Sequence, residues 1–443
     1  MKSNNPLNYK RLAIFVALAM AALFAACSDD ETVAPDTNHA PVVEFTVTAI
    51  AVPKNENKTL TISVTDPDGD EVSVLWEATR GTFTSAQGNP SIVWKAPTAT
   101  GLDTITVTAT DGEGGTTTIE ETIQVGTVKT SGISMSQAWH VADSPFIIRP
   151  VSSENKRFVI PTVTLSIDAG CELLIDSEEL EIYIEGTIQT NGTEANPVVI
   201  RPNVRHPESG HWQGITAVPD LEIPRVQLTC TDVLYAVDAV KSTTGGEVTL
   251  DGCRIMFAAG AAVTHRSYQA LTVVNSIITN NLKSGIRVEP ISDLSLPPSI
   301  VVSNDSIAVN GDVTGSTPYV QDAGIYIAMA DSDLTCDIQI TNNEISRNAF
   351  PGVHLVNVSR PALQNNSIFA NELGKTSQRY NVRLEDGFGG GAPGMIDARQ
   401  NFWGAAYTNL TDSTEIRLMI RDSEDVGNIT VRVAIDPWLH AKP

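Results

Sequence analysis

The chain is short of basic residues, and this shortage limits its partners. It has 29 lysines and arginines against 52 aspartates and glutamates, a formal net charge of −23 over 443 residues. The excess of negative charge disfavours nucleic acids and anionic membrane surfaces as main partners, because both are polyanions. A chain of this length is expected to contain two or three domains, since one hydrophobic core rarely serves so many residues.

Common catalytic motifs are also missing, and cysteine is scarce. The sequence contains no Gly-x-Ser-x-Gly, no His-Glu-x-x-His and no phosphate-binding loop. None of its five cysteines has Cys-x-x-Cys spacing, which argues against a metal cluster. Cys230 and Cys253 lie 23 residues apart in apolar segments, so we expect stacked inward thiols there. A disulfide between them is the alternative.

The apolar run at the N-terminus is too short to span a membrane. Three basic residues precede apolar residues 12–24, whereas a spanning helix needs about 20. This layout predicts a signal peptide at 1–26. The following Ala-Ala-Cys27 resembles a bacterial lipobox, although Phe24 stands where that motif usually has leucine. The resemblance implies that Cys27 is diacylated and anchors the protein in a membrane.

The residues after Cys27 indicate a destination. Ser28-Asp29-Asp30-Glu31 resembles the acidic signals that send some lipoproteins to the outer face of the outer membrane. We therefore expect a lipid-anchored, surface-exposed protein, with residues 27–40 as a flexible tether. An unmodified Cys27 and retention at the inner leaflet are the alternatives.

Residues 41–126 consist of short alternating segments separated by turn clusters, a pattern that predicts a small β-sandwich. They resemble the Ig-like modules of bacterial surface proteins. Within them, Asp66, Asp68 and Asp70 offer hard oxygen ligands, so calcium is possible here and no other cofactor is expected. An EF-hand is excluded because Glu71 replaces the required glycine. An Asx-rich turn without metal is the alternative.

A degenerate repeat occupies the second half of the chain. Apolar anchors at 233, 255, 277, 307, 345 and 368 are separated by 22, 22, 30, 38 and 23 residues. Such steps, rich in β-branched residues and without helical periodicity, predict a solenoid of short strands. Residues 132–443 resemble a right-handed parallel β-helix of the pectate-lyase-like fold. The chain is therefore expected to be all-β, with a terminal cap at each end of the solenoid.

The repeat assigns most of its residues to the scaffold. Ile277, Ile307, Ile345 and Ile368 are expected to stack inside the solenoid. Asparagines are expected at tight corners, where they tolerate left-handed backbone and bond one coil to the next.

One position of the repeat is expected to face outward. In Gly-(Ile/Val)-x-(Ile/Leu/Val) strands the flanking apolar residues point inward, so x points outward. These x residues, Arg287, Tyr326, His354 and Arg383, would form a surface stripe about 14 Å long over three coil steps. Extra residues follow the same strands and could form the wall of a groove. They would bring acidic side chains beside the stripe, namely Glu289, Asp293, Asp331, Asp333, Glu385 and Asp386.

These residue types suit the recognition of an acidic glycan, because arginine binds carboxylates and tyrosine has an apolar face with a polar tip. The favoured hypothesis is a non-enzymatic binding or adhesion module for extracellular polysaccharide or a surface protein. The second is a polysaccharide lyase or glycoside hydrolase, with Tyr326 or His354 as base. The third is a structural surface component.

Overall fold

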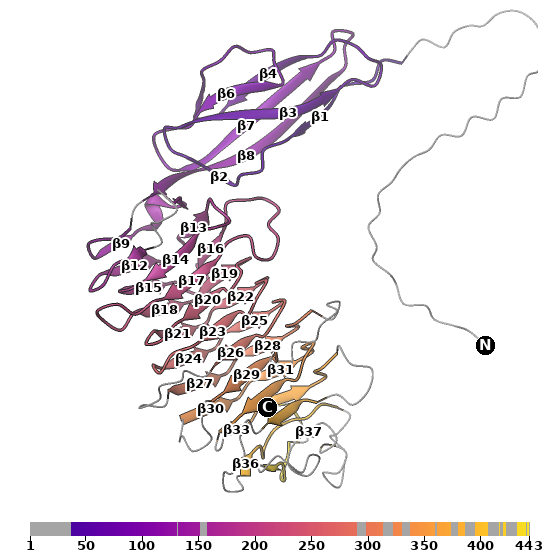
Figure 1. Cartoon of the computed structure of the whole chain (residues 1–443). Helices are drawn as coiled ribbons and strands as arrows, with labels where there is room; N and C mark the ends of the chain where they lie inside the picture. The colour runs from indigo at the N-terminus through magenta and orange to yellow at the C-terminus, as the bar shows by residue number, and fades with distance from the viewer. Residues whose placement is uncertain are drawn as a thin grey trace, which may run out of the picture.

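We analysed a computed structural model of the protein. It describes residues 37–130, 132–150, 157–289, 298–312, 322–329, 337–358, 361–373, 380–385, 395–405, 416, 420–421, 432–439 and 441–442. These residues form an all-β molecule in which a sandwich stands at one end of a long solenoid (Figure 1). The predicted signal peptide, Cys27 and most of the tether lie outside the described residues.

The sandwich packs two sheets around an apolar core. One sheet has the order β1 (Val42–Phe45), β3 (Asn57–Thr65), β6 (Ser91–Lys95), β5 (Thr82–Phe83). The other contains β4 (Ser73–Ala78), β7 (Gly101–Thr110), β8 (Thr116–Lys129) and β2 (Ala51–Pro53), which pairs with β8. Leu60, Trp76, Trp94 and Ile105 are at most 2% exposed between the sheets. Alternation along β7 explains the packing, since every second residue points inward.

The solenoid is a parallel β-helix with three long sheets, and each coil passes from sheet 3 to sheet 1 to sheet 2. Sheet 1 contains β10 (Phe146–Ile148), β13 (Glu172–Ile175), β16 (Val198–Pro202), β19 (Thr231–Leu234), β22 (Arg254–Met256), β25 (Ile277–Thr279), β28 (Ser306–Ala308), β31 (Glu344–Ser346) and β34 (Ser367–Phe369). Sheet 2 contains β11 (Arg157–Val159), β14 (Glu181–Ile184), β17 (Gly214–Ala217), β20 (Val240–Ser242), β23 (Val263–His265), β26 (Ile286–Val288), β29 (Ile325–Ala328), β32 (Val353–Val356), β35 (Val382–Glu385) and β37 (Ile420–Arg421). Sheet 3 contains β9 (Gln137–Trp139), β12 (Thr164–Asp168), β15 (Thr187–Asn191), β18 (Arg225–Thr229), β21 (Glu247–Asp251), β24 (Leu271–Val274), β27 (Ser299–Ser303), β30 (Asp337–Thr341), β33 (Ala362–Gln364), β36 (Met395–Asp397) and β38 (Arg432–Ala434). A 3-10 helix, η1 (Val141–Asp143), lies between β9 and β10.

The isoleucine ladder exists, but the prediction for Ile277 is wrong. Ile278, not Ile277, pairs with Ile307, and the ladder continues through Ile345 to Ile368. Ile277 is 44% exposed, whereas Ile278 is fully buried. The corner residue sets this register, because Asn275 adopts a left-handed backbone (φ 55°) and occupies the same position as Asn304 in the next coil.

The predicted asparagine corners are confirmed. Some asparagines turn the chain, and others next to them form hydrogen bonds between coils. Left-handed residues turn the chain between sheets 3 and 1, at Asn275, Asn304, Asn342 and Asn365. Buried amides next to the turns then bond successive coils, as where the Asn366 side chain accepts from the backbone of Asn343 at 2.9 Å. A second ladder of this kind joins Asn281, Asn310, Asn348 and Asn371 at the corner between sheets 1 and 2.

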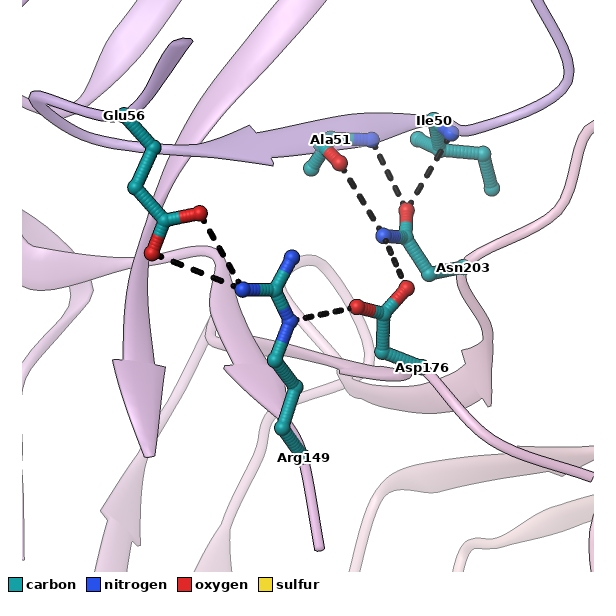
Figure 2. Close-up of polar contacts among 6 residues, drawn as sticks. All are labelled: Ile50, Ala51, Glu56, Arg149, Asp176 and Asn203. Carbon is teal, nitrogen blue, oxygen red and sulfur yellow. Dashed lines mark hydrogen bonds and ion pairs between the residues drawn. The ribbon is translucent and has the colours of Figure 1, made fainter. Parts of the chain in front are cut away.

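The sandwich and the solenoid share one continuous sheet. Strand β8 pairs in parallel with β10, so Thr127 lies opposite Phe146 and sheet 1 runs into the sandwich. Polar contacts reinforce this junction (Figure 2). Arg149 contacts Glu56 of the sandwich at 3.1 Å and Asp176 of the next coil at 2.6 Å.

Aromatic residues close the two ends of the solenoid core. Near the sandwich, Trp139 stacks on Phe146 with ring centroids 4.6 Å apart and meets Phe158 edge-on at 5.8 Å. At the other end Trp403 is 1% exposed and Trp438 packs against the same core. Among the described residues, no helix is long and apolar enough to cross a membrane.

Candidate functional site

A column of outward-facing side chains runs along sheet 2, and it contains the four predicted stripe residues. Arg287 pairs with Tyr326, Tyr326 with His354, and His354 with Arg383, so the predicted stacking is confirmed. Their neighbours in each strand, such as Ile325 and Ile327, lie in the solenoid core. The column therefore faces away from the core, as strand alternation requires.

The expectation that this stripe is open to solvent is wrong for its centre. Tyr326 is 4% exposed and His354 is 1% exposed. The Tyr326 ring packs with Ala323 and Ala328, and it meets the His354 ring edge-on at 5.2 Å. Burial raises the pKa of the Tyr326 phenol. Outward residues here bury one another, because bulky side chains on adjacent coils lie only about 4.8 Å apart.

The arginine at one end of the stripe is held by carboxylates. Arg287 forms ion pairs with Glu289 and, at 3.3 Å, with Asp322. Its guanidinium also lies over the Tyr326 ring, 5.2 Å from the centroid. Burial opposes ionisation of Glu289, yet hydrogen bonds from Arg266 and Arg287 hold its pKa below the ordinary value. The positive charge of Arg287 is thus neutralised within the protein.

The other end of the stripe has the same construction. Glu385 pairs with Arg383, and its carboxylate lies 3.4 Å from Nε2 of His354. The hydrogen bond with His354, followed by the charges of His354 and Arg383, lowers the pKa of Glu385 to about 2. A carboxylate in this setting remains ionised and orients the Arg383 guanidinium and the His354 ring beside it.

The column extends further toward the sandwich than the sequence predicted. Tyr183, Thr216 and Lys241 occupy the same register on β14, β17 and β20. Glu181 accepts from Thr216 Oγ1 at 2.6 Å and from Lys241 Nζ at 3.2 Å. Burial and the neighbouring Glu181 raise the pKa of Tyr183 to about 12. The Ile-Tyr-Ile spacing of β14 could have identified this part, but it lacks the glycine used to align the repeat.

Several predicted residues lie outside the described residues: Cys27, Asp293, Asp331, Asp333, Cys336 and Asp386. Their assignments stay predictions. The cysteines that are described, Cys171, Cys230 and Cys253, are free thiols. Cys253 is buried as expected, and burial raises its pKa to about 12. Cys230 instead sits at a corner with φ 42° and is half-buried, so the two thiols do not form the expected inward stack.

The three aspartates of the sandwich form a tight loop. Their carboxylates lie within 4.8 Å of one another. Oδ1 of Asp66 accepts from the backbone N–H groups of Asp68, Gly69 and Asp70, which makes an Asx-type turn. Burial and the neighbouring carboxylates raise the pKa of Asp70. Three carboxylates would be part of the six to eight oxygen ligands that calcium takes, and calcium binding stays a prediction.

Comparisons with known proteins agree with this architecture. Residues 38–124 match a family described as a bacterial Ig domain, and residues 233–385 match one described as a right-handed beta helix region. The chain is therefore an Ig-like domain followed by a right-handed β-helix. These two modules together suggest a surface or carbohydrate-related protein.

A solved structure of a nucleoside hydrolase-related hypothetical protein from Saccharophagus degradans, associated with carbohydrate metabolism, is 20% identical with a TM-score of 0.18. The likeness covers 20% of this chain and 26% of that one, and it is too small to bear on fold or function. No curated protein matches the chain.

Proposed function

We propose that this is a lipid-anchored cell-surface protein whose β-helix is a non-enzymatic binding or adhesion module for extracellular carbohydrate. A surface protein is the other partner class compatible with the proposal. The observation that carries it is the internal pairing of the charged groups in the sheet 2 column. Arg287 and Arg383 each contact a carboxylate of the same surface, so the column is a fixed, neutralised platform.

The pairing of charges favours binding over catalysis. A general base must reach a substrate proton and be unprotonated at working pH. Tyr326 is buried with a raised pKa, and His354 is buried beside Glu385. These features are those of a rigid scaffold. Burial keeps both side chains from a substrate proton, and the raised pKa keeps the Tyr326 phenol protonated near neutral pH.

A polysaccharide lyase or glycoside hydrolase acting on an acidic glycan is the second candidate. The adjacency of Arg287, Tyr326 and His354 favours it, because a cation beside two potential bases is what uronate elimination requires. The double variant Tyr326→Phe/His354→Ala separates the two candidates. Release of unsaturated sugars by the wild type, abolished in that variant, would establish the enzyme.

The anchor and the surface location rest on the N-terminal sequence, with the Ig-like domain holding the β-helix away from the membrane. Metabolic labelling with a palmitate analogue should be lost in Cys27→Ser. An impermeant amine reagent should label intact cells that carry the wild type. A purely structural surface protein would give the same two labelling results. The binding assay therefore decides between a binding role and a structural role.

Binding is tested by applying the full-length protein in mild detergent to an array of neutral, amino and acidic glycans. Retention of a defined glycan class, with no product released, supports the proposal. Loss of retention in Arg287→Ala/Arg383→Ala would place the ligand on the sheet 2 column. Unchanged retention would exclude that column as the binding site. Absence of retention on every glycan would overturn a carbohydrate-binding role.

A further inference from the structure

A pocket lies at the corner between sheets 3 and 1. None of its lining residues belongs to the sheet 2 column. Its volume is about 440 Å³, within the range of about 300–1,000 Å³ typical of small-ligand sites. The lining comes from the corner after β15, from three corners further along the solenoid, and from the outer face of sheet 1.

The roof of the pocket is an overhanging corner. Six residues, 192–197, connect β15 to β16, whereas one residue connects β18 to β19 and two connect β21 to β22. The overhang is held in place, because Gly192 donates to the Thr229 carbonyl at 3.1 Å and Asn196 accepts from Gly170 at 3.0 Å. A Cβ atom at Gly192 would lie 2.2 Å from the Cys230 carbonyl oxygen, so only glycine fits this approach. The roof is therefore pre-formed.

The wall of the pocket carries polar groups in fixed orientations. Arg254 donates from Nε to Asp232 at 2.6 Å and pairs with it again through Nη2. This bidentate pair orients the guanidinium, while 48% of the Arg254 side chain stays exposed. One coil further on, Asn275 donates from Nδ2 to Asp251 at 2.8 Å. Donors and acceptors thus alternate across a short stretch of wall.

Apolar surface and charge narrow the ligand class. Ile277 pairs with Arg254 in the sheet and lines the pocket. Its side chain is 44% exposed, so it gives the otherwise polar pocket an apolar surface. Among the charged lining residues, Glu194, Asp232 and Asp251 outnumber the single Arg254. This balance disfavours an acidic ligand.

We propose that this pocket binds an uncharged or amino sugar of mono- or disaccharide size. Each sugar hydroxyl both donates and accepts a hydrogen bond, which matches the alternating amide, guanidinium and carboxylate groups of the wall. The C–H face of the ring would contact Ile277 and Pro197. The inference rests on the proposed carbohydrate-binding function, and it adds a second binding site outside the sheet 2 column, for a class of sugar that is not acidic.

Saturation-transfer NMR on the full-length protein in detergent tests the pocket directly. The probes are the methyl glycosides of glucose, galactose, N-acetylglucosamine, glucosamine and glucuronic acid. At least one uncharged or amino glycoside should show saturation transfer from the protein, and the glucuronide should bind most weakly. Asn275→Gly keeps the left-handed corner and removes only the amide, and Arg254→Gln removes the charge. Each should raise the dissociation constant about tenfold or more.

The matched control is Asn304→Gly, since Asn304 is also exposed and left-handed (φ 61°) in the next coil but lies outside the pocket. It should bind like the wild type. Equal binding by Asn275→Gly and Arg254→Gln, or preference for the glucuronide, would overturn the pocket assignment. If the array retains glycans while the pocket variants remain unaffected, the proposed function stands and only the pocket fails. If neither array glycans nor glycosides bind, both fail.

Discussion

Asn203 of the β-helix and Ala51 of the Ig-like domain exchange two hydrogen bonds. The Asn203 Oδ1 atom accepts from the Ala51 N–H at 2.8 Å, and its Nδ2 donates to the Ala51 carbonyl at 3.0 Å (Figure 2). The same Oδ1 accepts from Ile50 at 3.1 Å. Because Asn203 is 4% exposed, this exchange is shielded from water and joins the two domains.

Replacing Asn203 by alanine should therefore loosen the junction. The backbone groups of Ala51 would lose their buried partner, which costs about 1–3 kcal/mol for each unsatisfied group. Urea denaturation should show a lower midpoint and an earlier, separate transition of the Ig-like domain. The exposed Asn191 is the control, and Asn191→Ala should change stability by less than about 0.5 kcal/mol. Equal effects of the two substitutions would contradict the coupling of the domains through Asn203.

Two adjacent isoleucines should respond very differently to truncation. Ile278→Ala removes a fully buried side chain from the ladder and should lower the free energy of unfolding by about 2–5 kcal/mol. Ile277→Ala removes a side chain that is 44% exposed and should cost about 0.5 kcal/mol or less. Thermal and urea denaturation measure both. A larger effect at Ile277 would mean that the strand is shifted by one residue.

Asp305 occupies an asparagine position of the ladder and makes it sensitive to pH. In later coils, Asn343, Asn366 and Asn401 donate from Nδ2 to a carbonyl of the preceding coil. An ionised Asp305 has no proton to donate, and its Oδ2 is buried without a hydrogen-bond partner. Burial, and to a smaller degree the nearby charge of Asp251, raise the pKa of Asp305 to about 7.

The raised pKa of Asp305 means that its contribution to stability is present below about pH 4 and is lost as the pH rises through about 7. Asp305→Asn should thus leave stability nearly unchanged near pH 4 and raise it at pH 8, by an amount on the order of a few kcal/mol. Unfolding by urea at several pH values measures this. Asp337→Asn, at an exposed position, should show no such trend. A variant that stabilises equally at both pH values would rule out titration of Asp305 as the cause.

Glu385 should produce the opposite pH dependence. Its pKa is lowered to about 2, so its contribution to stability is present above its ordinary pKa of about 4.5 and is lost as the pH falls toward 2. Glu385→Gln should destabilise the protein at pH 7, and the difference from the wild type should shrink in acid. The exposed Glu120→Gln serves as the control in thermal unfolding. A difference that persists unchanged at pH 2 would exclude the ion pairs as its source.

Much of the architecture is readable from the sequence because the solenoid repeats local rules. Asparagine corners recur from Asn275 onward, and aliphatic residues stack at one position from Val233 to Ile368, so a degenerate pattern identifies the fold and the outward position x. The register is harder to read. At Asn342-Asn343 two asparagines are adjacent, and only the backbone shows that Asn342 turns the chain while Asn343 bonds the coils.

The environment of the stripe depends on contacts that no local pattern encodes. Alternation correctly places Tyr326 and His354 outside the core, yet it says nothing about neighbours on the same face that bury them. The pocket arises from a difference in length between corners of successive coils, which matters only after the coils are stacked. Asn203 likewise looks like any loop residue, since its partners lie about 150 positions earlier in the chain.

The shared sheet has a consequence for the order of assembly. An Ig-like domain that ended at β8 would leave an unpaired strand edge, which invites association with other chains. Here β10 pairs directly with the end of β8, so this part of the edge is covered within the chain itself. Each new coil then offers an edge to the next, so growth can proceed in one direction from a folded template. We therefore expect the N-terminal domain to act as the template on which the coils assemble in order from β10 onward.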